Sequence, residues 1–243
     1  MRSTRIRRGL AAALAVSALC LTAACGDSDD GGKKDGKTAD KAVDKGAGKG
    51  AGDGAKPLTA AQMSAGVLAL ADLPEGWKAD KPDTDEETAK VDKPECQALG
   101  GFFSTKVEGA TMGSEAAFQG DGGGSMLSHQ TFTFPGTGAA DYVAAVGEAL
   151  KTCTAFTLTQ AGEDMKITVK KLAAPQSGEA AHAFRIAMDI PQLSMKFESD
   201  GMVAHQGTGA MRLTFTPPDA SGHPAFDDLA KRAGEKFAKA VQG

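Results

Sequence analysis

The most constraining feature of this 243-residue chain is a period-two alternation of apolar and polar residues in its C-terminal half. Such alternation is typical of β-strands with one buried and one solvated face. The links between the alternating segments are too short for parallel crossover connections, so the pattern predicts an antiparallel, meandering sheet. The alternating segments are 165–170, 183–190, 193–198 and 211–216.

Helical patterns flank these strands. Thr59 and Gln62 have the spacing of a capping box ahead of a helix predicted over 60–72, and Pro74 would end that helix. Helices that flank strands, rather than alternating with them, indicate an α+β fold. We therefore expect a curved antiparallel sheet of about five to seven strands, with three or four helices packed on one face. The other predicted elements are a short helix over 94–103, strands at 114–119 and 126–134, and helices over 139–153 and from 226 onward.

The first 24 residues are organised like a signal peptide. Four arginines precede an apolar stretch over 9–21 that is too short to span a membrane. The sequence Leu-Thr-Ala-Ala-Cys that follows resembles the bacterial lipoprotein signal, or lipobox. The resemblance implies that residues 1–24 are removed and that the Cys25 thiol is lipidated. The chain would then be anchored to the cell membrane on its extracytoplasmic side; the alternative is ordinary secretory cleavage with a free Cys25.

Residues 25–57 then form a predicted tether. Glycine, lysine and aspartate dominate residues 26–56, where Val43 is the only residue that is larger and more apolar than alanine. Because this segment can bury almost no apolar surface, we expect it to be disordered. Residues 58–243 form a single predicted extracytoplasmic domain. Loss of residues 1–25 removes four arginines and no acidic residue, which takes the net charge from −4 to −8 and argues against nucleic-acid binding.

The cysteines fit an exported protein. Of the four, Cys20 leaves with the signal peptide and Cys25 receives the lipid, which leaves Cys96 and Cys153. Two cysteines in an oxidising compartment most simply form one disulfide. A reactive or metal-binding thiol pair is the alternative, but their 57-residue separation is unlike a redox C-x-x-C motif.

No motif for catalysis is present in the sequence. There is no nucleophile elbow, no zinc-protease helix, no EF-hand loop and no P-loop; the glycine-rich segment 120–125 lacks the P-loop lysine. We therefore expect no catalytic residue, cofactor or metal ion. The four histidines are interpreted as ordinary surface residues, although His129, His182 and His205 could form a metal site if the fold brought them together.

The methionines suggest a ligand site instead. Several of them fall in the strand-rich half, and methionine suits adaptable apolar binding surfaces. One hypothesis is that they line an apolar cleft; the alternative is that they fill gaps in the core. The candidate ligand-binding residues are Trp77, Met165, Met188, Met195 and Met211.

Three local motifs carry a resemblance to a known family. They are the Leu-Pro-x-Gly-aromatic turn at 73–77, the pair Phe134-Pro135 at a strand end, and Lys-Thr-Cys at 151–153 at a helix end. Over about 58–242 the chain resembles the extracytoplasmic sensor-like domain of the actinobacterial kinase PknH and the LpqN-type lipoproteins. The resemblance implies an antiparallel sheet with helices over it and a cleft, and it implies ligand binding or sensing in the cell envelope without catalysis.

The leading functional hypothesis is a non-catalytic, membrane-anchored domain that binds a small or lipidic ligand or an envelope protein. A carrier of lipid or other hydrophobic cargo between membrane and wall is the alternative, and an extracellular enzyme is less expected. The lining of the pocket should separate them. A deep apolar cavity favours the carrier, a mixed groove favours sensing, and converging ionisable groups favour the enzyme.

Overall fold

The computed structural model describes residues 56–82, 89–190 and 195–243. The predicted signal peptide, Cys25 and almost the whole predicted tether lie outside the described residues. The helices are α1 (Ala60–Gly66), α2 (Gln97–Gly100), α3 (Gly138–Thr152) and α4 (Ala225–Gln242). The strands are β1 (Lys78–Asp80), β2 (Lys90–Val91), β3 (Thr111–Gln119), β4 (Met126–Thr133), β5 (Ala155–Gln160), β6 (Glu163–Leu172), β7 (Ala180–Ile190), β8 (Met195–Gln206) and β9 (Gly209–Thr216).

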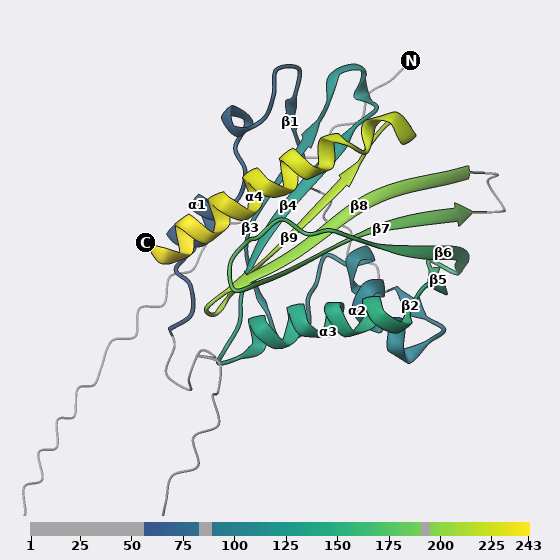
Figure 1. Cartoon of the computed structure of the whole chain (residues 1–243), viewed down its shortest axis with the longest axis horizontal. Coiled ribbons are helices and arrows are strands. Elements are labelled where there is room, and N and C mark those ends of the chain that lie inside the picture. Colours follow the sequence, from purple (N-terminus) through teal and green to yellow (C-terminus); the bar gives the residue numbers. More distant parts are fainter. Residues whose placement is uncertain (1–55, 83–88, 191–194) are drawn as a thin grey trace, which may run out of the picture. The chain divides into compact units, whose positions relative to one another are not determined.

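All described strands join one antiparallel sheet in the order β1-β3-β4-β9-β8-β7-β6-β5-β2 (Figure 1). Strands β5 to β9 form a meander, in which β6 to β9 correspond to the predicted alternating segments, and β9 then pairs with β4 of the β3–β4 hairpin. The α+β antiparallel class is confirmed. The predicted strand number was too low, because the described part of the sheet has nine strands rather than five to seven.

Two of the strands that were not predicted, β1 and β2, lack a pattern of their own. β1 and β2 are edge strands of three and two residues, and they are strands because Lys78 pairs with Gln119 and Val91 with Leu158. Such short edges are defined by their neighbours' hydrogen bonds, which a local pattern does not contain. β5 is also short and begins three residues after α3 ends, where no turn motif separates the helix from the strand.

Helices cover both faces of the sheet, so the prediction that they pack on one face is wrong. On one side, here called the α4 face, Met202 and Leu213 pack with Phe226 and Leu229 around α4. On the other side, the α3 face, Val203 packs with buried residues of α3. Since neighbouring residues of a strand point to opposite faces, Met202 and Val203 place the two helices on opposite sides.

Burial on both faces explains this error. Residues 200–205 of β8 and 209–213 of β9 are all buried, so no side of these central strands is exposed to solvent. Alternation predicts a solvated face only when the polar residues reach water. Here Arg212 and Gln130 face α3 and hydrogen-bond to each other beneath protein.

The first helix is shorter than predicted. The capping box of Thr59 and Gln62 is present, but α1 ends at Gly66 and Val67 has extended backbone. The N–H of Leu68 donates to Nδ1 of His129 at 3.0 Å, so a side chain of β4 takes a donor that a longer helix would have used internally. A 3-10 turn, Leu70–Asp72, occupies the remainder of the predicted helix.

The Cys96–Cys153 disulfide is present, with 5.4 Å between the two Cα atoms. Cys96 directly precedes α2 and Cys153 directly follows α3. Both cysteines are buried in the cluster between α3 and the sheet. The bridge therefore fixes α2 beside the C-terminal end of α3, as the sequence predicted.

Candidate functional site

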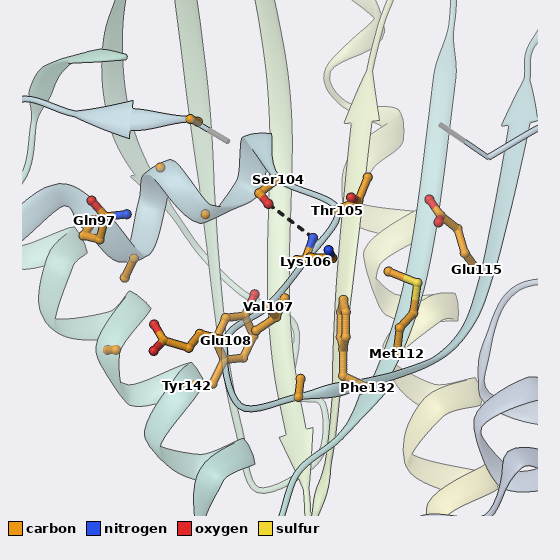
Figure 2. A pocket seen from close by; sticks show the side chains of 16 residues that line it. Gln97, Ser104, Thr105, Lys106, Val107, Glu108, Met112, Glu115, Phe132 and Tyr142 are labelled. Carbon is orange, nitrogen blue, oxygen red and sulfur yellow. Dashed lines mark hydrogen bonds between the residues drawn. The ribbon is translucent and has the colours of Figure 1, made fainter. Parts of the chain in front are cut away.

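A cleft of about 990 Å³ lies on the α3 face, between α2, α3, the strands β3 and β4, and the connecting segment 104–110. Figure 2 shows Gln97 and Tyr142 on its helical side and Met112 and Glu115 on its strand side. Four sequence-distant elements therefore build one cavity. Its volume is typical of small-molecule sites.

The cleft has an apolar interior and a polar rim. Phe132 of β4 is only 1% exposed and lies at the centre of the cleft in Figure 2. Met112, by contrast, is 42% exposed at the mouth. Such a lining suits a ligand with one apolar and one polar side. The other apolar lining side chains include Val107 and Tyr142, and the polar and charged ones include Gln97, Ser104, Thr105, Lys106, Glu108 and Glu115.

Local sequence explains how the aromatic residues are placed. Phe132 and Phe134 are alternate residues of an extended segment, so they point to the same side. The turn that follows includes Gly136, whose φ of +54° favours glycine. It leads directly into α3, where Tyr142 stacks on Phe134 with 5.7 Å between ring centroids. The Phe-Pro-Gly turn thus sets where the Tyr142 ring enters the cleft.

Arg212 of β9 lies beneath the cleft and is 4% exposed. Its Nε donates to Oε1 of Gln130 at 2.7 Å. Its Nη1 and Nη2 donate to the carbonyl oxygens of Gly101 and Ser104, each at 2.9 Å. One guanidinium therefore holds both ends of the segment 101–104 against the sheet, and residues Gly101 and Ser104 line the cleft.

The Arg212 guanidinium has aromatic rings rather than a carboxylate beside it. Its central carbon lies 5.5 Å from the ring centroid of Phe102 and 5.6 Å from that of Phe132. Burial lowers the pKa of Arg212, and the nearby Tyr142 and Glu115 partly oppose that shift. Burial also raises the pKa of Tyr142, while the Arg212 charge acts in the other direction. The described residues place no carboxylate within 4.0 Å of the Arg212 nitrogens.

The candidate ligand-binding residues from the sequence do not gather around this cleft. Trp77 and Met211 belong to the cluster on the α4 face. Met165 is buried on the α3 face, in the cluster with α3. Met195, at the start of β8, is 41% exposed. Met188 borders a smaller cavity, described below.

Sequence reasoning missed the residues that shape the cleft. The alternation places Arg212 on a solvated strand face and Phe132 on the buried face of its strand, and no pattern singles out Tyr142. One signal could have identified Arg212. An arginine between Met211 and Leu213, in the middle of a strand that has no other charge, indicates either a solvated face or a buried cation with a structural partner.

The histidines do not converge on one site. His129 lies on the α4 face, and burial lowers its pKa to about 3. Because His129, His205 and His223 are all buried, the prediction that the histidines are surface residues is wrong for these three. His182 lies on the other face, against α3 at Gly147. Across the described ranges, no three histidine, cysteine, aspartate or glutamate side chains are placed to hold a metal ion.

His223 belongs to a separate charged network near the start of α4. Its Nδ1 lies 2.7 Å from Oδ2 of Asp200, and its Nε2 lies 2.9 Å from Oε2 of Glu198. Asp200 is fully buried and also accepts from Arg185, at 2.6 Å to Nε and 3.2 Å to Nη2. The Arg185–Asp200 ion pair and the two hydrogen bonds of His223 join the segment before α4 to strands β7 and β8.

No protein family matches the chain in a comparison of sequences, and no curated protein matches it either. Solved structures do match. In fold, the chain is similar to the extracellular domain of PknH from Mycobacterium tuberculosis. The match covers 78% of this chain and 97% of that domain, with a TM-score of 0.52 and 15% sequence identity. An uncharacterized protein from Mycobacterium smegmatis, the Rv0999 ortholog, matches over 76% of this chain and 95% of its own, with a TM-score of 0.40 and 14% identity.

The PknH match confirms the fold that the sequence resemblance predicted. At this level of identity, the likeness concerns fold alone. Among the described residues, no helix combines the length and apolar character needed to cross a membrane. The cleft itself is therefore the feature that indicates a function.

Proposed function

We propose that this chain is an extracytoplasmic, non-catalytic domain that binds a small ligand in the cleft between α2, α3, β3 and β4. The observation that carries the proposal is the cleft, about 990 Å³ in volume, with an apolar interior and a polar rim. The fold likeness to an extracellular domain supports the extracytoplasmic location, and the Cys96–Cys153 disulfide fits an oxidising compartment.

The charges around the cleft favour a ligand without net charge. Lys106 at the rim and Arg212 beneath it are cationic, and Glu108 and Glu115 at the rim are anionic. The Oε1 of Glu115 accepts from the hydroxyl of Ser128 at 3.1 Å, which keeps the carboxylate on the strand side. Balanced charge gives no electrostatic preference for an anion or a cation. We therefore propose a neutral amphipathic molecule whose apolar side contacts Phe132.

The mixed lining favours ligand sensing over bulk lipid transport. A carrier needs a cavity that removes most of an apolar cargo from water, whereas charged and polar groups surround this cleft. The carrier remains the second candidate, because Met112 and Val107 give the mouth an apolar strip. Exchange of bound ligand with lipid vesicles would distinguish the two, since only a carrier should release its ligand to them.

Ligand binding can be tested with two variants of α3. Ala145 lines the cleft, and its neighbour Ala144 is also exposed but does not line it. Native mass spectrometry of the protein purified from its own envelope should show a bound mass. Ala145→Trp should remove that mass, whereas Ala144→Trp should keep it. A bound mass that survives Ala145→Trp, or its absence from the unsubstituted protein, would count against the cleft as the site.

Lipid anchoring at Cys25 is the second part of the proposal. It derives from the lipobox resemblance of the sequence before Cys25. Two acyl chains would give stable attachment, because a single chain binds a membrane only marginally. Labelled palmitate should enter the protein, and Cys25→Ala should move it from the membrane to the soluble fraction. A Cys25→Ala protein that stays equally membrane-bound would refute the anchor.

A further inference from the structure

A second cavity, here called the aromatic groove, lies on the same face of the sheet as the cleft. Its volume is about 210 Å³. It lies between the 3-10 turn Gly101–Phe103 and the strands β7, β8 and β9. Its apolar lining consists of Phe102, Phe103, Phe184, Ile186, Met188 and Phe197.

The aromatic groove offers water few partners. Its hydroxyl groups belong to Ser199 and Thr214, and the Ser199 hydroxyl is already hydrogen-bonded to Thr216 Oγ1 at 2.7 Å. Asp200 also borders the groove, but its carboxylate binds Arg185 and His223. Because a buried water needs two to four polar partners, the groove favours an apolar occupant over water.

The groove is preformed by close packing. Phe102 meets Phe184 edge to face, with 4.6 Å between ring centroids. Phe184 lies across Gly201 of the neighbouring strand, and a Cβ at Gly201 would come within 2.7 Å of the Phe184 ring. Glycine at position 201 therefore lets the ring lie flat against β8. Phe102 in turn is held by the Arg212 guanidinium, so the walls do not depend on a ligand.

The groove is distinct from the cleft. The segment 101–104 separates the two, since Gly101 and Ser104 line the cleft while Phe102 and Phe103 line the groove. Arg212 anchors this partition through the carbonyl oxygens of Gly101 and Ser104. A ligand in the groove would therefore occupy a site of its own.

We propose that the aromatic groove is a second binding site, which takes one aromatic ring of a small molecule. A volume of 210 Å³ accommodates one substituted ring, given that a dry cavity of about 150 Å³ lined by aliphatic and aromatic residues is known to bind benzene. Four phenylalanines supply ring edges and faces, and such aromatic contacts add to the stabilisation from buried area alone.

The test uses toluene as the probe and the methyl NMR signals of the full chain as the readout. Toluene should shift the methyl signals of Ile186 and Met188 saturably and give intermolecular NOEs to them. Thr214→Phe places a ring into the groove and should weaken toluene binding at least tenfold. Thr168→Phe introduces the same side chain at an exposed strand position outside the groove and should change the affinity less than twofold.

Several results would overturn the proposal. Shifts that stay linear with toluene concentration, or NOEs to Met202 and Leu213 on the α4 face instead, would place the probe elsewhere. Equal toluene affinity in Thr214→Phe and the unsubstituted protein would also place the probe outside the groove. Tighter binding of n-hexanol than of toluene would reject an aromatic ligand. If Thr214→Phe does not fold, the NOEs of the unsubstituted protein decide. The result is independent of the Ala145→Trp experiment, so either site can fail without the other.

Discussion

Two arginines on the central sheet show how the same residue type can serve different ends. Arg185 of β7 pairs with the buried Asp200, which also meets His223. Arg212 of β9 donates instead to neutral groups, the amide of Gln130 and two backbone carbonyls, and its guanidinium lies near the rings of Phe102 and Phe132. The first arginine is paired with a buried carboxylate, in a network that joins the segment before α4 to the sheet. The second has no carboxylate within 4.0 Å among the described residues, lies under a cleft and positions its wall.

The partners of a buried charge separate a structural role from a functional one. A charge neutralised by a buried carboxylate contributes mainly by leaving no ion unpaired. A charge held by carbonyl oxygens instead fixes the course of the backbone that supplies them. In this protein, that backbone is the partition between the cleft and the aromatic groove. Arg185 thus contributes to the stability of the fold, and Arg212 sets the geometry of the site.

The largest expected effect comes from breaking the carboxylate side of the comparison. Asp200→Ala would leave Arg185 and His223 without their shared buried partner, and should lower the free energy of unfolding by about 3–5 kcal/mol. Urea unfolding followed by circular dichroism measures this. The matched control is Asp228→Ala, which removes an aspartate that pairs with Arg232 on the exposed side of α4 and should cost less than about 1 kcal/mol. A similar loss of unfolding free energy in both variants would show that the Asp200 network stabilises the fold no more than an exposed ion pair does.

Removing Arg212 should have a smaller global effect and a larger local one. Arg212→Met leaves no unpaired ion, but two backbone carbonyls lose their donors, so we expect about 2 kcal/mol of destabilisation. Hydrogen exchange should rise at residues 101–104 while the core of β8 stays protected. Unchanged exchange in that segment would mean that Arg212 does not hold the partition.

A third buried basic group, His129, should make the free energy of unfolding depend on pH, because its imidazole is neutral in the folded chain. Its folded pKa of about 3 lies below the ordinary value of 6.5, so between these values only the unfolded chain binds the proton. Stability should therefore fall as pH decreases from 6.5, with a limiting slope of about 1.4 kcal/mol per pH unit from this residue. His129→Gln retains an acceptor for the Leu68 N–H. It should reduce the slope by about 1.4 kcal/mol per pH unit, the contribution of one proton. An unchanged slope would assign the acid sensitivity to other groups.

The smallest expected effect concerns the rings around Arg212. Phe102→Leu keeps an apolar side chain but removes the cation–π contact and the edge-to-face contact with Phe184, so we expect a loss of about 1 kcal/mol. A double-mutant cycle with Arg212→Met separates the two contributions. A coupling energy near zero would show that the ring does not stabilise the cation.

Local sequence signals predicted the elements that depend on local contacts. The capping box at Thr59 and the helix predicted over 139–153 depend on neighbours in the sequence. The Cys96–Cys153 disulfide was predictable for another reason, because only two cysteines remained to pair. The end of α1 was not predictable in this way. It depends on His129, which is 61 residues from its partner Leu68.

The candidate site was harder to predict, because its residues are joined by topology. Arg212 meets Gly101 and Ser104 more than a hundred residues away, and nothing in the sequence indicates that β9 lies next to β4. Alternation placed Arg212 on the polar face correctly but could not show that this face is covered. The methionine hypothesis had the opposite problem, since Met165 and Met211 share an apolar character but lie on opposite faces of the sheet.

Arg212 also fixes the alignment of β9 within the sheet. On one side of this strand, Met211 and Leu213 are fully buried beneath α4, and on the other side lies the guanidinium. Sliding β9 by a single residue against β4 and β8 would exchange the two sides and bring a cation into the apolar cluster beneath α4. A competing register would be strongly disfavoured, so this one side chain helps the folding chain to select a single pairing of its central strands.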